Sequence, residues 1–108
     1  MAEDVLYTVY QGDCLKFDVD PRDEDDLPFD FTGADVAVTL TWPGGSWSDD
    51  LAGGVTVTDG VITAEIPSAT TALLPVGRRA RLHVAIIDSG GCPLTVIAGR
   101  LRVLRKGL

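Results

Sequence analysis

Asp35-Val-Ala-Val-Thr-Leu-Thr-Trp42 is the stretch that decides the fold. Its apolar side chains recur at every second position, since Val36, Val38 and Leu40 alternate with acidic, small or hydroxyl residues. Successive side chains of a β-strand point to opposite faces, so this stretch has one apolar face and one mostly polar face. We therefore expect residues 35–42 to form a core strand of a β-sandwich.

The same alternation continues on both sides of this strand. It predicts six further strands, over residues 5–10, 14–20, 55–58, 61–66, 79–87 and 94–104. Asp59-Gly60 joins two of these runs and is the strongest short signal for a hairpin turn. Turn residues recur between the runs, as in an all-β sandwich. The sequence thus predicts an immunoglobulin-like antiparallel β-sandwich of about seven strands.

The sequence also predicts the structure of two connections between strands. Residues 68–74 are the helical candidate, in which Ser68 caps one short turn and Pro75 ends it. We expect Leu73 and Leu74 to dock on the core. Pro43-Gly-Gly-Ser-Trp47 is expected to be an irregular loop that ends the strand before it.

The length and composition fit a single domain over residues 1–108. A chain of this size buries roughly two thirds of its unfolded surface, so its core needs no metal or disulfide. We expect Cys14 and Cys92 to be free thiols, because neither belongs to a CxxC motif. The first residues lack the pattern of a signal peptide, and no apolar run is long enough to span a bilayer. The expectation is a soluble protein made in a reducing cytoplasm.

No pattern of residues predicts catalysis or a cofactor. His83 is the only histidine and has no nucleophile or orienting acid at a suggestive spacing, so we expect it on the surface. The acidic stretch 18–26 fails the EF-hand pattern, because Asp23 stands at the sixth position and Phe29 at the twelfth. We expect no enzyme, no metal site and no cofactor.

The charges suggest where a partner binds. Residues 1–50 carry thirteen acidic and two basic side chains, whereas residues 51–108 carry three acidic and seven basic ones. If residues 79–87 and 94–104 pair, their outward arginines crowd one surface, which is unfavourable unless an anionic group faces them. The candidate interface residues are Asp20, Asp23, Glu24, Asp25, Asp26, Arg79, Arg81, Arg100 and Arg102, with Trp47 as an anchor if its indole is exposed rather than capping the core.

Three anionic groups could face these arginines. Nucleic acid is disfavoured by the pI of about 4.4 and by the lack of aromatic residues among the arginines. The acidic stretch could come from the same chain or from a neighbouring copy. We favour the neighbour, which gives a head-to-tail contact able to close into rings.

The order of short motifs resembles a known family. Gln11-Gly-Asp-Cys-Leu-Lys-Phe17 is similar to the "GD-x-L-x-F" strand of small immunoglobulin-like modules in tailed bacteriophages, and residues 23–36 are similar to their "DEDG-x-P-x-D-L-T-G-A-x-V" stretch. Residues 57–63, 66–67, 74–77 and 99–103 follow in the same order. The likeness is to the N-terminal domain of phage baseplate upper proteins and to short virion proteins of similar pattern. Asp26 departs from a usual turn glycine, and Cys14 and Cys92 stand at positions that are usually polar.

The resemblance implies a non-enzymatic structural protein of a virion, made in the host cytoplasm. It would be a small adaptor or decoration subunit of the tail, baseplate or neck, or alternatively a decoration protein of the capsid head. Its partners would be other virion proteins and copies of itself, without nucleic acid or membrane, and no receptor-binding domain is expected after Leu108. The unusual cysteines leave open a disulfide in the assembled particle. From another class, a carbohydrate-binding module would place Trp42, Trp47 and Tyr10 in an exposed row.

Overall fold

The computed structural model describes residues 6–21, 31 and 33–105. They form eight strands and one short helix, namely β1 (Leu6–Tyr10), β2 (Leu15–Val19), β3 (Asp35–Trp42), β4 (Gly45–Asp50), β5 (Thr56–Thr58), β6 (Val61–Ile66), α1 (Ser68–Thr71), β7 (Gly77–Ile87) and β8 (Pro93–Leu104).

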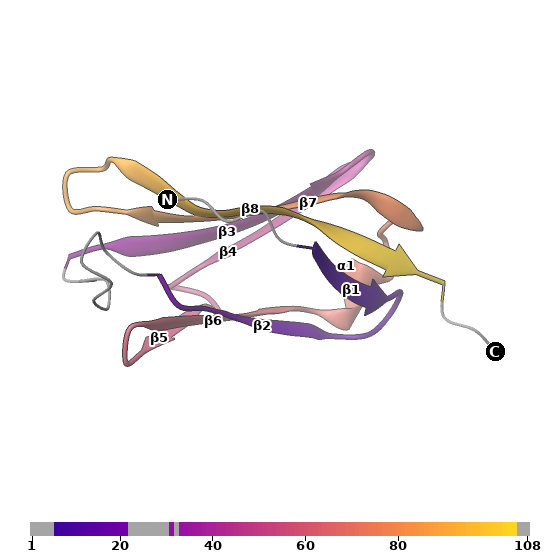
Figure 1. The fold of residues 1–108 in the computed structure, drawn as a ribbon, viewed down its shortest axis with the longest axis horizontal. Coiled ribbons are helices and arrows are strands. Elements are labelled where there is room, and N and C mark those ends of the chain that lie inside the picture. The colour runs from indigo at the N-terminus through magenta and orange to yellow at the C-terminus, as the bar shows by residue number, and fades with distance from the viewer. Residues whose placement is uncertain (1–5, 22–30, 32, 106–108) are drawn as a thin grey trace.

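The strands make two sheets that pack face to face (Figure 1). One sheet has the order β1-β8-β7-β3-β4 and the other the order β2-β6-β5. An immunoglobulin-like sandwich likewise packs two sheets face to face, and β4 here adds a strand beside β3. The predicted fold class is therefore confirmed. One pair departs from an antiparallel arrangement, because β1 runs parallel to β8.

The core lies between the sheets and follows the period-2 alternation of the strands. Val36, Val38 and Leu40 of β3 are fully buried, as are Ile62 and Ile66 of β6 in the opposite sheet. Burial of one apolar side chain of this size contributes roughly 1.5–3 kcal/mol, so the paired apolar faces hold the sheets together. The alternation that predicted the strands thus also identified most of the core.

The structure corrects the expectation for residues 43–47. Instead of an irregular loop, Pro43 and Gly44 form a two-residue turn, and β4 pairs antiparallel with β3 from Gly45 to Asp50. Gly44 has a φ of 103°, which favours glycine because it has no Cβ. The alternation in Ser46-Trp-Ser-Asp-Asp50 is weak, since only one large apolar side chain marks its inner face. This missed strand raises the number of strands from about seven to eight.

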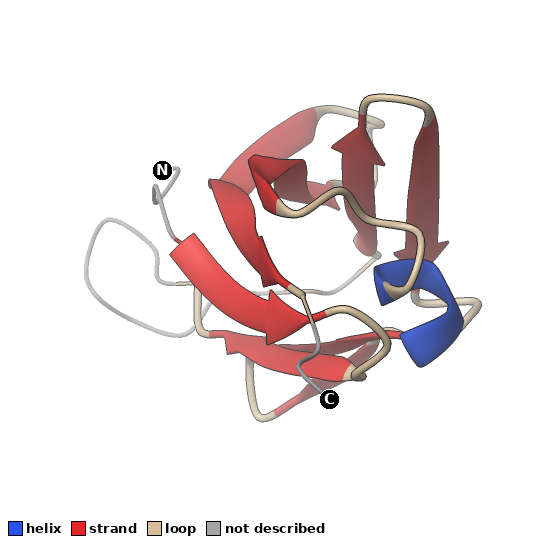
Figure 2. Cartoon of the chain, turned by 90° about the vertical axis from the view of Figure 1, so that its right-hand side faces the viewer, coloured by secondary structure: helices blue, strands red, loops and turns tan. Residues whose placement is uncertain are grey.

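The helical prediction is confirmed for its position but wrong in two details. The residue at the N-cap is Pro67, and no side chain caps the helix, so Ser68 does not act as the cap. Leu74 is fully buried as expected, whereas Leu73 is 69% exposed. Helix α1 connects the two sheets at one end of the sandwich (Figure 2).

Both cysteines are free and exposed, as predicted. Cys14 lies just before β2, and Cys92 lies in the turn between β7 and β8. The core between the sheets therefore forms without a cross-link.

Candidate functional site

The outer face of the five-stranded sheet carries a group of arginines. In β7 the buried Ala80 and Leu82 alternate with the exposed Arg81, which therefore points away from the core. In β8 the same alternation turns Arg100 outward, beside the buried Leu101. The pairing of β7 with β8 places Arg81 directly opposite Arg100.

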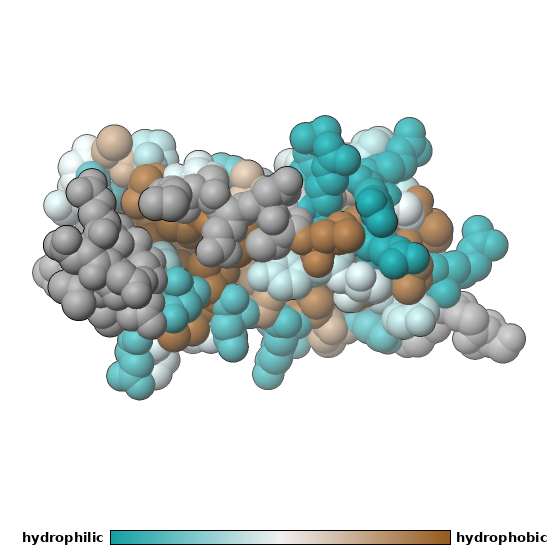
Figure 3. All heavy atoms as spheres, viewed as in Figure 1, coloured by the Kyte–Doolittle hydropathy of each residue, from teal (hydrophilic) through white to brown (hydrophobic). Residues whose placement is uncertain are grey.

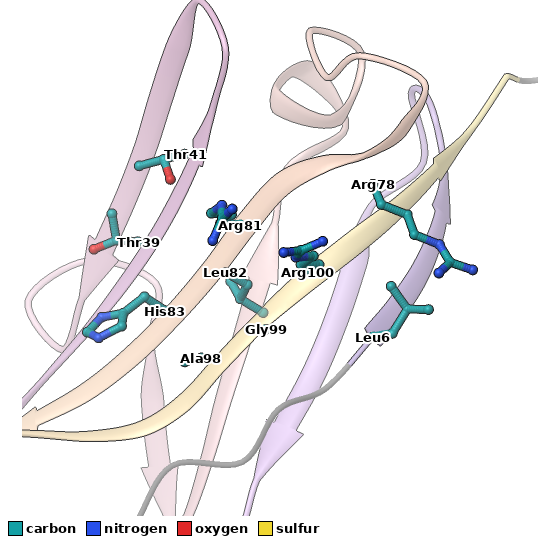
Figure 4. A pocket seen from close by; sticks show the side chains of 10 residues that line it. All are labelled: Leu6, Thr39, Thr41, Arg78, Arg81, Leu82, His83, Ala98, Gly99 and Arg100. Atoms are coloured by element: carbon teal, nitrogen blue, oxygen red, sulfur yellow. The ribbon is translucent and has the colours of Figure 1, made fainter.

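These arginines border an open hollow of about 830 Å³. Its polar lining includes Arg78, Arg81, Arg100, His83, Thr39 and Thr41. Figure 4 shows these side chains spread over β3, β7 and β8, with Leu6 of β1 at one side. Figure 3 shows strongly hydrophilic side chains gathered over the right-hand part of the five-stranded sheet. The surface can therefore receive a group that carries several negative charges.

The guanidinium groups lack anionic partners within the part of the chain that the structure describes. The side chains of Arg78, Arg81 and Arg100 make no ion pair or hydrogen bond with another described residue. Like charges directly opposite each other across a β-ladder are unfavourable. An anionic partner would remove this repulsion and gain charge-assisted hydrogen bonds, which are stronger than neutral ones.

The four predicted arginines are all exposed, but the structure rearranges their roles. Arg81, Arg100 and Arg102 lie on the outer face as expected, with Arg102 opposite Thr8 of β1. Arg79 is exposed but does not border the hollow, whereas Arg78 does. The pairing of β7 with β8 shifts register between Gly77 and Ala80, which breaks the strict alternation on which the prediction relied. The adjacent arginines in the sequence were the only signal for Arg78.

The structure describes only one of the acidic residues predicted to face the arginines. Asp20 is exposed just after β2, in the other sheet, whereas Asp23, Glu24, Asp25 and Asp26 lie outside the described residues. After this stretch the structure describes Phe31 and then the chain from Gly33 onward. A Cβ added to Gly33 would lie 3.3 Å from the Cβ of Ser89.

Gly33 therefore lies beside the turn between β7 and β8. Arg81 pairs with Thr41 near the other end of β3, so this contact lies at the far end of the sheet from the hollow. Whether the acidic stretch contacts the arginines stays a prediction.

Trp47 packs against the core, which agrees with the predicted alternative in which it caps the core rather than serving as an exposed anchor. It pairs with the fully buried Leu40 and so shares its inward direction. Its indole is half-buried and joins the edge of the hydrophobic core. Trp47 and Trp42 also border a second hollow of about 430 Å³ beside the exposed Leu73.

The aromatic residues considered for sugar binding do not form one row. Trp42 and Trp47 both pack against the core from the side of β3 and β4. Tyr10, which is 47% exposed, lies on β1 at the opposite edge of the five-stranded sheet. A carbohydrate-binding module of the predicted kind needs these rings on one exposed surface.

The other described features concern His83, metal ligands and membrane-spanning helices. His83 is exposed, as predicted, and its Nε2 lies 2.9 Å from the Thr95 hydroxyl oxygen. No group of three or more potential metal ligands gathers among the described residues. Within the same ranges, no helix has the length and apolar character needed to cross a membrane.

The sequence matches no protein-family model and has no significant match among curated proteins.

Proposed function

We propose that this chain is a non-enzymatic structural protein of a tailed-bacteriophage virion. It would serve as a small adaptor or decoration subunit of the tail, baseplate or neck and would bind other virion proteins and copies of itself. The likeness of its motif order to small phage modules supports this proposal, together with an immunoglobulin-like sandwich in which the described motifs fall on strands and turns.

The observation that carries the proposal is the arginine face. Arg81 and Arg100 lie opposite each other and have no acidic partner among the described residues. Two arginines that repel each other do not stabilise the fold. A contact with another molecule explains their position better. The open hollow beside these residues has no enclosed pocket geometry, which suits a docking surface more than a catalytic site.

The test is incorporation into particles. Tailed particles from the host that carries the gene should contain the chain, detectable by mass spectrometry of purified virions and located by gold labelling. Replacement of Arg79, Arg81, Arg100 and Arg102 by Ser should abolish its incorporation, because the docking charges are lost. Purified virions that lack the wild-type chain, or normal incorporation of the four-serine variant, would contradict the proposal. Labelling of the head instead would support the alternative role as a capsid decoration protein.

A further inference from the structure

The outer face of the five-stranded sheet carries opposite charges at its two ends. The arginine end contains Arg81 and Arg100, which pair with each other. Along β3, Thr41 pairs with Arg81, and Asp35 lies six residues earlier on the same outward side. At about 3.3 Å per residue, Asp35 is roughly 20 Å from the arginine end. Asp50 of β4 lies opposite Ala37, about 13 Å from that end along the strand.

The two carboxylates are available for a partner. Asp35 accepts a hydrogen bond from the amide of Val36 through Oδ1, at 2.7 Å, and Asp50 accepts one from Gly53 through Oδ1, at 3.1 Å. The Oδ2 atom of each makes no hydrogen bond or ion pair with another described residue. Asp49 differs, because both of its oxygens accept hydrogen bonds from the amide of Gly54.

The described surface between these ends carries no acidic, lysine or arginine side chain and consists mostly of short side chains. Thr39 and His83 pair with each other midway along the face, and Ala98 pairs with His83. Towards the acidic end, Ala37 pairs with Ala85. Short side chains allow two sheet faces to approach closely, so charged groups at each end can meet across the contact.

We propose that two copies of this chain pair through this face about a two-fold axis. The axis lies in the plane of the contact and passes near Thr39 and His83, at the midpoint between the charged ends. It places Arg81 and Arg100 of each copy against Asp35 and Asp50 of the other. A two-fold contact uses the same patch on both copies, and this patch is self-complementary in charge. This pairing rests on the proposed function, because it specifies how copies of the chain would bind each other. The pairing itself requires no other virion protein.

The size of the face indicates a weak dimer. The four strands β8, β7, β3 and β4, at about 4.8 Å spacing and about eight residues at about 3.3 Å, present roughly 500 Å² per copy. The two copies together would bury about 1,000 Å², which is about the least area expected of a specific interface. We therefore expect association in the micromolar range at low ionic strength, weakened by added salt because the pairs lie at the rim.

Charge reversal tests the pairing by sedimentation equilibrium of the pure protein. Arg81→Glu with Arg100→Glu should weaken the dimer roughly tenfold or more, and so should Asp35→Lys with Asp50→Lys, since each brings like charges together. Equimolar mixing of these two variants should restore a one-to-one dimer. All four substitutions in one chain should also restore it, because the face becomes self-complementary again.

The control reverses a pair on the other sheet. Lys16 and Glu65 are exposed and lie opposite each other on β2 and β6, so Lys16→Glu with Glu65→Lys keeps the net charge and should leave the dimer unchanged. A thermal melt of each variant identifies any that fails to fold.

Three outcomes would overturn the two-fold pair. They are a wild-type chain that stays monomeric, a variant with lysines at Asp35 and Asp50 that associates normally, and assembly that continues beyond two copies. The last two would support the head-to-tail contact with the acidic stretch instead. Particle incorporation is measured separately, so loss of incorporation with an intact dimer contradicts only the virion role. Normal incorporation of a monomeric chain contradicts only the pair.

Discussion

Thr71 is the one polar side chain among the described residues that is completely buried, and it connects two parts of the chain. Its hydroxyl oxygen accepts a hydrogen bond from the amide of Gly12 at 3.0 Å. The same hydroxyl lies 2.7 Å from the carbonyl oxygen of Asp13, to which it donates. The side chain of Gln11 adds a hydrogen bond to the carbonyl oxygen of Leu74, at 2.9 Å. The turn after β1 is thereby joined to α1, although they are distant in sequence.

Thr71→Val should therefore destabilise the fold with little change in side-chain shape. It removes the acceptor of the part-buried Gly12 amide and a donor to the Asp13 carbonyl oxygen, and a polar group that loses its hydrogen bond away from water costs about 1–3 kcal/mol. We expect the free energy of unfolding in urea to fall by about 2 kcal/mol.

Thr70→Val is the matched control at the neighbouring helical position. The Thr70 side chain makes no hydrogen bond with another described residue. The free energy of unfolding of Thr70→Val should therefore stay within about 0.5 kcal/mol of the wild-type value. Equal losses in the two variants would show that the hydroxyl of Thr71 contributes nothing specific.

At the scale of elements, the β3–β4 hairpin depends on a close contact between an indole and a glycine. Gly45 pairs with Trp42, and a Cβ added to Gly45 would lie 2.8 Å from Cζ2 of that indole. Real Cβ atoms do not approach a ring so closely, so any larger residue at this position must displace Trp42. The glycine thus allows the ring to lie across the hairpin.

Gly45→Ala should consequently move Trp42 and weaken the hairpin. Overpacking of this kind costs roughly 1–3 kcal/mol. In a Trp47→Phe background Trp42 is the only tryptophan, so its fluorescence emission should shift to longer wavelength as the ring becomes more exposed. Ser46→Ala, at the exposed next position, should leave the emission unchanged; an unchanged spectrum for Gly45→Ala as well would contradict this account.

At the scale of the whole molecule, the sandwich is held by apolar contact between two sheets without a cross-link. Cys14 and Cys92 are free and exposed. We expect Cys14→Ser with Cys92→Ser to change the free energy of unfolding by less than about 0.5 kcal/mol, as for most surface substitutions. The melting temperature of the wild-type chain should be the same with and without reductant. A loss of stability on reduction would instead reveal a disulfide that contributes to the folded state.

The sequence by itself determined the fold class and most of the core. Regular alternation in β3, β6, β7 and β8 predicts which side chains face inward, because the direction of a side chain depends only on the two-residue period of the strand. The turn at Asp59-Gly60 was also predictable, because Asp-Gly favours a hairpin turn in which both residues have a positive φ. In the structure these φ angles are 52° and 79°. The outward direction of Arg81 and Arg100 followed from the same alternation.

Only the tertiary structure decided which outward residues become neighbours. The register shift after Gly77 places Arg78 rather than Arg79 beside the hollow, and the weakly alternating β4 brings Asp50 onto the same face. The parallel pairing of β1 with β8 puts Leu6 next to Arg100. These relations depend on pairing between segments far apart in the chain, which local patterns do not encode. For that reason the sequence revealed the arginines, whereas the structure revealed the carboxylates that share their surface.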